Sequence, residues 1–561
     1  MAPVRAQAPD AGADAMARSG SPDALSWWGE PGRPGWMPEA WQGTAYPAAF
    51  AGLVVGGWTL QQPGRAPEAL PWPGVLQARA PLAWYDTLEV RPDGGGAGAG
   101  FGAGAAGLRA ASAAPGRGAR STFSLASGDG GVDENALTVA RGDSVTGFEL
   151  EAMNGARGAA SGVERGGRHR WGAGVRFVLG RNRFESSFGQ RSAATQLAGG
   201  EQQAASGRSG ELAWRWARGD FSGLVGFARG FDRHESFGGL LASSRREAQD
   251  DRLVAEAQRS RDGRVLGARL EWSRAQVKRF GSGAFGREAR SLWATAHARL
   301  PSAAGRLDLA LGAGYHGGVD RIDVAPSAVY SFRWRGLEAG ATLERLLAPV
   351  WADLAAGQQP FLQHAWLGGV RAVTLRTRPW RARGELRAGR AYSRALADRL
   401  PLEELWLRRG LRAEAGTCDV LLADGGLEWE ARHADAGLEG FALALRTPHS
   451  DAPRADPGGG FRVWLGGRTA LFSGDLGVHV RAEVEGVGAR EAEVGTVRRL
   501  PGFVTLGLAG EFVVGDATLT VRARNLEDRE REQSWLDTST GRLALAGRRD
   551  LRFTLTWRLF N

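Results

Sequence analysis

Apolar and polar residues alternate along most of this chain with a period of two. Near the C-terminus three successive segments have their apolar positions at Val504, Leu506, Leu508, Phe512 and Val514, at Ala517, Leu519, Val521 and Ala523, and at Leu551, Phe553, Leu555, Trp557 and Leu559. Polar or small residues occupy the positions between them. This pattern is typical of a β-strand with one apolar face and one face in water. The segments are therefore predicted to be strands.

The connections between these segments alternate in length. We expect short turns at 514–516, 472–475 and 433–437, and long polar loops at 526–548, 486–501 and 447–460. Outer-membrane barrels carry tight turns at one end and long loops at the other, whereas a soluble sheet has no reason to keep this asymmetry. The loop lengths therefore favour a transmembrane barrel.

Strand-length segments of the same kind continue from Ser121 to the C-terminus. They number about 22, which is within the range of large single-chain outer-membrane barrels. Examples lie at 137–140, 171–179, 212–216, 221–231, 253–257, 292–300, 307–315, 337–343 and 463–465. We predict an all-β fold, a large antiparallel transmembrane β-barrel over residues 116–561.

The first 115 residues differ from the rest of the chain. Residues 1–22 are small, polar and turn-rich, and we expect a disordered leader in which Ala6-Gln7-Ala8 is the small-x-small remnant of a signal peptide. Residues 23–115 are dense in Pro and Trp and alternate poorly, which predicts a small separate domain. Gly102, Gly104 and Gly107 have the spacing of a dinucleotide-binding motif. No amphipathic helix follows them, which argues against nucleotide binding.

The composition agrees with a membrane barrel and argues against several other classes of protein. The chain has 21 Trp and 5 Tyr, so Trp would supply most of the two aromatic girdles of the barrel. Its formal net charge is +10, but the Arg residues are spread along the chain rather than gathered on one element, and we expect no nucleic-acid partner. The single Cys418 excludes an internal disulfide.

Candidate catalytic and metal-binding residues do not form a recognisable pattern. The eight His residues are scattered, and we find neither a nucleophile elbow nor a marked pair of catalytic carboxylates. We therefore expect no enzyme, cofactor or metal. The i, i+2 pairs Glu428/Glu430 and Glu483/Glu485 would each face the lumen, where Arg432 or Arg481 could pair with them.

One polar and aromatic segment is a candidate ligand-binding loop. It contains Trp351, Asp353, Gln359, His364 and Trp366. Loops on rigid scaffolds often carry binding function. A solvated loop with interfacial Trp anchors explains the same residues, and both interpretations remain open.

Two groups of residues resemble TonB-dependent outer-membrane receptors. At the C-terminus, Asn525, Leu526 and Asp528 resemble the family's Asn-Leu-x-Asp signature, and Phe553, Trp557 and Phe560 lie in a segment similar to its closing strand. In the N-terminal domain the similarity is to the end of the plug, although the segment is short and divergent for a plug. It is carried by Leu88, Glu89, Val90 and Arg91, and then by Phe101, Gly102, Gly104 and Gly107.

This resemblance implies a receptor in the outer membrane of a Gram-negative-type bacterium. Such a receptor would take up a scarce small solute, draw energy from the TonB complex of the inner membrane, and contact outer-membrane lipid and lipopolysaccharide. We expect a monomer. A barrel without energy coupling, acting as a passive pore or a surface-binding scaffold, is the alternative, and an outer-membrane hydrolase is the third. The sequence does not identify the solute.

Overall fold

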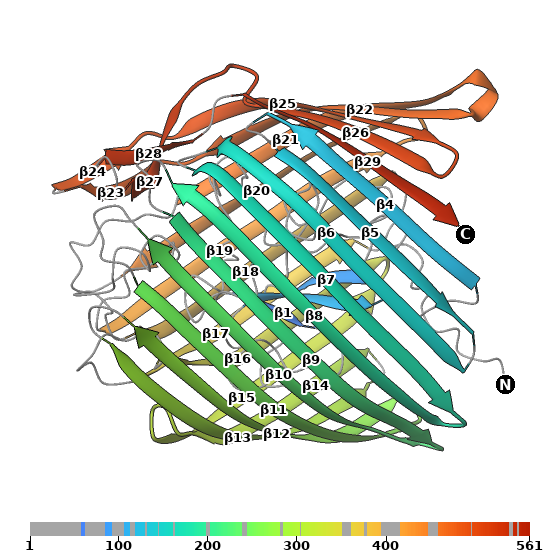
Figure 1. The fold of residues 1–561 in the computed structure, drawn as a ribbon, viewed down its shortest axis with the longest axis vertical. Coiled ribbons are helices and arrows are strands. Elements are labelled where there is room, and N and C mark those ends of the chain that lie inside the picture. The colour runs from blue at the N-terminus through green and yellow to red at the C-terminus, as the bar shows by residue number, and fades with distance from the viewer. Residues whose placement is uncertain are drawn as a thin grey trace.

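The chain forms one closed β-barrel that surrounds a small sheet (Figure 1). The computed structural model describes residues 58–61, 85–91, 106–112, 118–129, 132–143, 145–160, 163–197, 202–237, 244–280, 284–302, 304–350, 361–374, 379–393, 416–446, 458–494, 496–537, 542–546 and 549–560. Among these residues no helix is long and apolar enough to cross a membrane.

The barrel has 22 antiparallel strands, as predicted. In chain order they are β4 (Gly118–Gly128), β5 (Val132–Gly142), β6 (Thr146–Ala160), β7 (Val163–Leu179), β8 (Asn182–Leu197), β9 (Gln202–Arg218), β10 (Phe221–Phe237), β11 (Ser244–Arg261), β12 (Arg264–Phe280), β13 (Phe285–Pro301), β14 (Gly305–His316), β15 (Arg321–Trp334), β16 (Leu337–Val350), β17 (Phe361–Thr374), β18 (Trp380–Ser393), β19 (Gly416–Glu430), β20 (Ala434–Arg446), β21 (Gly459–Leu471), β22 (Leu476–Val487), β25 (Phe503–Val514), β26 (Ala517–Arg524) and β29 (Asp550–Phe560). The last strand, β29, pairs with β4 and closes the barrel.

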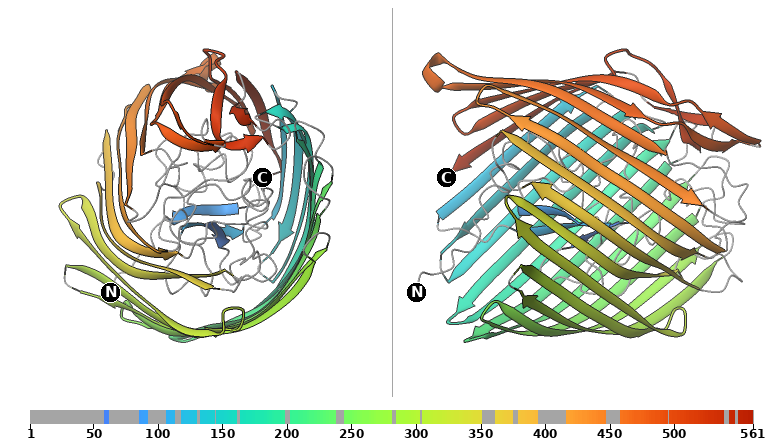
Figure 2. Two further views of the ribbon diagram at one scale, coloured as in Figure 1. Left: turned by 90° about the vertical axis from the view of Figure 1, so that its left-hand side faces the viewer. Right: turned by 180° about the vertical axis from the view of Figure 1, so that it is seen from behind.

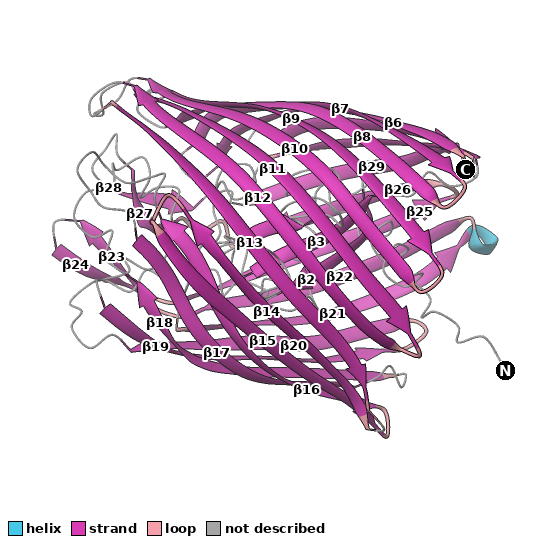
Figure 3. Cartoon of the chain, turned by 90° about the horizontal axis from the view of Figure 1, so that it is seen from below, coloured by secondary structure: helices cyan, strands magenta, loops and turns pink. Residues whose placement is uncertain are grey.

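Within the described residues, seven further strands are not part of the barrel wall. Strands β1 (Trp58–Gln61), β2 (Tyr85–Arg91) and β3 (Ala106–Ser112) form a sheet in the order β1-β3-β2, which the barrel encloses (Figure 2). Two hairpins, β23 (Arg490–Val494) with β24 (Thr496–Leu500) and β27 (Arg531–Asp537) with β28 (Arg542–Ala546), extend from one end. The short 3-10 helix η4 (Phe472–Gly474) joins β21 to β22 at the opposite end (Figure 3).

The predicted alternation places apolar side chains on the outer surface of the wall. On β29, Phe553 and Trp557 are about half exposed, whereas Thr554 between them is buried on the lumen side. Large exposed apolar side chains recur in the same way on strand after strand around the barrel. An outward apolar band of this kind requires hydrocarbon as its surroundings, and barrel closure satisfies the backbone hydrogen bonds within it.

Tight turns join the strands at the end of the barrel where the chain terminates, which we call the turn end; the opposite end is the loop end (Figure 2). Gly180, Gly219 and Gly515 each open a two-residue turn with a positive φ of 61°, 58° and 54°. Glycine adopts this conformation without steric strain and lets the turn follow the twist of the strands.

The structure corrects three of the expected connections. Strand β19 ends at Glu430 and β20 begins at Ala434, so the turn lies at 431–433 rather than 433–437. The expected loops at 486–501 and 526–548 largely consist of the hairpins β23–β24 and β27–β28. Between β4 and β9 the connections are short at both ends, so the asymmetry in length belongs to the C-terminal half of the barrel.

Candidate functional site

A row of charged side chains crosses the lumen side of five neighbouring strands, β18 to β22. We call it the charge row, and its members are Arg383, Asp424, Glu439, Arg462 and Glu485. Alternation turns these side chains inward, because residues next to them on the same strands, such as Leu438 and Val463, are exposed on the outer surface. The row is therefore part of the lumen wall.

Glu439 is the centre of the charge row. Its Oε2 accepts a hydrogen bond from Arg383 Nη2 at 2.9 Å, and its Oε1 accepts one from Arg462 Nη1 at 3.3 Å. Strand register explains this bridge, since Glu439 lies directly opposite Arg462 on one side and opposite Gly426 on the other. Gly426 has no side chain, so Arg383 can pass over β19 and reach Glu439.

The remaining members are Asp424 on β19, which pairs with Arg383, and Glu485 on β22, which pairs with Arg462. Arg383 Nη1 donates to Asp424 Oδ1 at 2.6 Å, and Arg462 Nε donates to Glu485 Oε1 at 2.9 Å. The side chains of Arg462 and Glu439 are each 1% exposed. Charges removed from water in this way must be paired, and removal of one partner leaves an uncompensated charge. The row thus ties five strands together on the lumen side.

A second group of charged residues lies nearer the turn end. Asp435, the second residue of β20, contacts His479 Nε2 at 2.6 Å and accepts a hydrogen bond from Arg481 Nη2 at 3.0 Å. Arg468 joins this group through an ion pair with Asp435 at 3.8 Å, and its Nη1 donates a hydrogen bond to Glu430 at 3.0 Å. The lumen wall therefore presents both signs of charge in fixed positions.

The acidic pairs face the lumen as expected, but their partners are not those predicted. Glu485 pairs with Arg462 and Glu430 with Arg468, whereas Arg481 pairs with Asp435. The expected pairing with Arg432 or Arg481 considered residues close in sequence. Cross-strand register brings other arginines nearer.

The candidate ligand-binding residues are only partly within the described chain. Trp351, Asp353 and Gln359 lie outside the described residues. His364 and Trp366 lie within β17 rather than in a loop, and Trp366 is 44% exposed on the outer surface. Ligand binding by these five residues stays a prediction.

The plug-like residues fall partly on the enclosed sheet. Leu88, Glu89, Val90 and Arg91 lie in β2, and Gly107 lies in β3, opposite Arg91. Phe101, Gly102 and Gly104 lie outside the described residues. The sheet lies within the lumen, where an occluding element would have to be (Figure 2). The division into a leader, a plug and a barrel stays a prediction.

The C-terminal signature forms a turn at the loop end of β26. The side chain of Asn525 donates from Nδ2 to Arg529 O at 2.8 Å and accepts from Arg529 N at 3.4 Å. Asp528 accepts a hydrogen bond from the N–H of Arg549 at 3.0 Å, close to the start of β29. These contacts bring together the two ends of the connection that contains β27 and β28. Leu526 donates its N–H to Leu506 O on β25.

The other C-terminal residues belong to the closing strand. Phe553 and Trp557 point outward from β29, and Phe560 is its last residue. The pairing of β29 with β4 shifts register between Arg558 and Phe560. Among the residues that the structure describes, no cluster of His, Cys, Asp and Glu could hold a metal ion.

Comparisons with known proteins find a shared fold without sequence similarity. No protein-family model matches the sequence, and no curated protein matches it. The FrpB iron transporter from Neisseria meningitidis superposes with a TM-score of 0.72 at 10% identity, over 89% of this chain and 91% of the transporter.

Two other solved structures are as similar. The ferric yersiniabactin uptake receptor FyuA from Yersinia pestis has a TM-score of 0.72 at 11% identity, over 90% of this chain and 89% of the receptor. The copper transporter OprC has a TM-score of 0.70 at 14% identity, over 90% of each chain. The similarity covers about nine tenths of the length of these proteins. The resemblance to TonB-dependent receptors is thereby confirmed for the fold, and the chain is a closed β-barrel with the architecture of these receptors and transporters.

Proposed function

We propose that this protein is a TonB-dependent outer-membrane receptor that imports a scarce solute. The observation that carries this proposal is the enclosed sheet β1–β3 within a closed barrel of 22 strands. A passive pore needs an open lumen, whereas a sheet inside the lumen is what a gated receptor requires. Energy from the inner membrane would then be used to move this sheet and open a path.

The class of solute is inferred from the shared fold. The solved structures with this fold include an iron transporter, a receptor for ferric yersiniabactin and a copper transporter. Iron or copper complexes are therefore the first solutes to test, although a fold alone does not determine what a protein binds. The lumen wall also carries partly exposed charged side chains at fixed positions, such as Arg468 and Arg481, that a polar solute would meet as it passes.

Single-channel conductance tests whether the N-terminal residues close the lumen. We would compare the full-length protein with a variant that starts at residue 113, between β3 and β4, so that every barrel strand is kept. A closed full-length protein and an open truncated barrel would support the gated receptor. Equal, large conductance from both would contradict it and support the passive pore.

Uptake by whole cells tests the energy coupling. Cells that carry the protein would be given radiolabelled ferric or copper complexes with and without a functional TonB complex. Accumulation that requires both the protein and the complex is the expected result. Accumulation that is independent of the complex would contradict energy coupling even if the barrel is closed at rest.

A further inference from the structure

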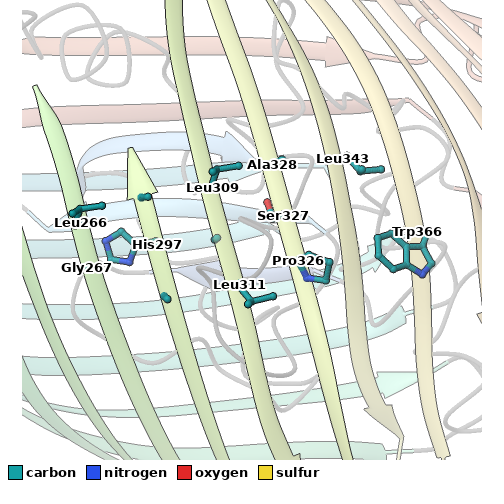
Figure 4. A pocket seen from close by; sticks show the side chains of 13 residues that line it. Leu266, Gly267, His297, Leu309, Leu311, Pro326, Ser327, Ala328, Leu343 and Trp366 are labelled. Carbon is teal, nitrogen blue, oxygen red and sulfur yellow. The ribbon is translucent and has the colours of Figure 1, made fainter. Parts of the chain in front are cut away.

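A hollow lies on the outer surface of the barrel, across strands β12 to β17 (Figure 4). It has a volume of about 510 Å³, and we call it the outer groove. Its rim is formed by Leu266, Leu309, Leu343 and Trp366, which are between 38% and 55% exposed on the lipid-facing side. The outer groove is thus open to the surroundings of the barrel rather than to its lumen.

Small residues make the hollow. Ala298, Leu309, Ala328 and Leu343 lie opposite one another in register on four successive strands, so they form one row across the wall. Alanine occupies two positions of this row on the outer face, and Pro326 lies next to it on β15. Larger outward side chains, such as Leu266, Leu311 and Trp366, surround this row. The floor of the outer groove is therefore lower than the surrounding surface.

The outer groove rises from the turn end towards the middle of the wall. Leu266 lies two residues from the turn end of β12, and Trp366 lies eight residues from the turn end of β17. The two positions thus differ by six residues in their distance from the turn end, which corresponds to about 20 Å along a strand. At a strand tilt of about 45° this is about 14 Å of depth in the membrane. Half of a hydrocarbon core of ~30 Å is about 15 Å. The outer groove therefore covers the depth of one leaflet, on the turn-end side.

An excess of positive charge lies where the outer groove approaches the turn end of the barrel. Arg261 on β11 and Arg264 on β12 are directly opposite each other, and both side chains are exposed on the outer face. Arg259 lies opposite Leu266, which belongs to the rim. Like charges directly opposite each other destabilise a strand pair unless an anion lies between them. The nearby Asp262 contacts Arg261 at 3.5 Å and neutralises one of the three arginines.

From this arrangement we propose that the outer groove binds one acyl chain of an anionic glycerophospholipid from the turn-end leaflet. The phosphate would lie between Arg261 and Arg264, and the chain would follow the row of small residues towards Trp366. Guanidinium groups bind phosphate through charge-assisted, often bidentate hydrogen bonds. An apolar groove that faces hydrocarbon is filled by hydrocarbon, and the arginines select the lipid whose headgroup carries the charge.

Photo-crosslinking tests this site in the full-length protein. The probe is phosphatidylglycerol with a diazirine near the end of one acyl chain, added at low mole fraction to phosphatidylethanolamine vesicles that contain the refolded protein. Labelled peptides are then mapped by mass spectrometry. The expected result is labelling concentrated around Pro326, Leu343 and Trp366. Even labelling of all lipid-facing strands would overturn the proposal, because it would show ordinary surrounding lipid only.

Two variants with matched controls separate the acyl-chain contacts from the charge contacts. Ala328→Trp fills the floor of the outer groove with a large side chain. If the acyl chain loses contact over two methylenes, occupancy of the groove by lipid falls by about tenfold. Its control is Ala255→Trp, at an outward alanine of β11 away from the outer groove. The double change Arg261→Gln with Arg264→Gln lowers labelling by removing the phosphate contacts. Its control is Arg335→Gln, at an exposed turn-end arginine beside Trp334.

Each comparison has an outcome that contradicts the site. Unchanged labelling in Ala328→Trp would exclude an acyl chain in the outer groove. Equal labelling by the phosphatidylglycerol probe and by an uncharged diacylglycerol probe with the same chain would exclude the role of the arginines. Heat-modifiable migration in gel electrophoresis tests whether each variant has a folded barrel. A loss of labelling is counted only for variants that pass this test, so that unfolding is not its cause.

Discussion

Arg345 on β16 reaches across an interruption in the barrel wall to Asp323 on β15. Its Nη1 donates to Asp323 Oδ1 at 2.5 Å and to the carbonyl oxygen of Val324 at 2.6 Å. In the described wall, β15 pairs with β16 only from Ser327 to Trp334, so these contacts lie beyond the last backbone pair. The side chains of Arg345 and Asp323 therefore replace hydrogen bonds that a regular ladder would supply.

Proline accounts for the interruption. The N–H of Val324 donates to Asp323 Oδ1, and the carbonyl of Val324 accepts from Arg345, so the backbone of Val324 faces β16. Pro326 lies two residues further and faces the same strand, but it has no N–H to donate. Proline inside a sheet is normally confined to edges and bulges. Here the ion pair stabilises the opening that Pro326 creates.

We predict that Arg345→Met weakens this part of the wall. Asp323 is 6% exposed and would lose its shorter ion pair, while Arg321 would remain at 2.9 Å. Loss of a hydrogen bond to a charged group costs about 1.5–3 kcal/mol. Amide hydrogen exchange of β15 and β16 should become faster, with β10 and β11 unchanged. Unchanged exchange at the interruption would show that the ion pair does not hold it closed.

Removal of the central carboxylate should destabilise the barrel more than removal of an exposed one. Glu439→Ala leaves two buried guanidinium groups without their shared partner, which costs about 3–5 kcal/mol. Glu288→Ala is the control, because its partners Arg274 and Arg290 are 42% and 69% exposed, and ion pairs at the surface contribute little to stability. The measurement is the midpoint of urea unfolding in lipid vesicles. Similar midpoints for the two variants would contradict this role of Glu439.

The sequence predicts which face each of these residues occupies, but not its partner. Alternation alone places Glu485 in the lumen and Phe553 in the lipid, because a shift by one residue would reverse both faces. The partner of Glu485 depends on register across β21 and β22, which the turn at η4 determines. The expected partner Arg481 shares a strand with Glu485, whereas Arg462 lies directly opposite it.

The outer groove could not have been predicted from the sequence for the same reason. Alanines at 298 and 328 are unremarkable on their own strands. They form a hollow only because register aligns them across the wall with Leu309 between them. Arg261 and Arg264, in contrast, flank the turn Asp262-Gly263, so their opposition could be read from a hairpin of this length.

Substitution of Asn525 should loosen the connection between β26 and β29. Asn525 has a φ of 49°, which asparagine tolerates better than most residues, and its side chain contacts the backbone of Arg529 twice. Asn525→Ala loses both advantages and should cost about 2 kcal/mol. Asn525→Gly keeps the backbone conformation and should cost about 1 kcal/mol, since it loses only the amide. Limited proteolysis within residues 530–548 measures the effect, and equal cleavage of both variants would contradict the role of backbone conformation.

We predict that position 437 requires glycine, because the ring of the tryptophan opposite it occupies the space that a side chain would need. Trp464 is 5% exposed, and its ring covers Gly437 so closely that an added Cβ would collide with carbon atoms of the ring. Gly437→Ala must displace this ring and should cost about 1–3 kcal/mol. Gly384→Ala on β18 is the matched control, because nothing lies within 4 Å of an added Cβ there. This control should stabilise the barrel by about 0.5–1 kcal/mol, since alanine loses less backbone entropy on folding. Opposite shifts of the two unfolding midpoints are expected. Equal shifts would mean that the effect comes from loss of glycine as such and not from the contact with Trp464.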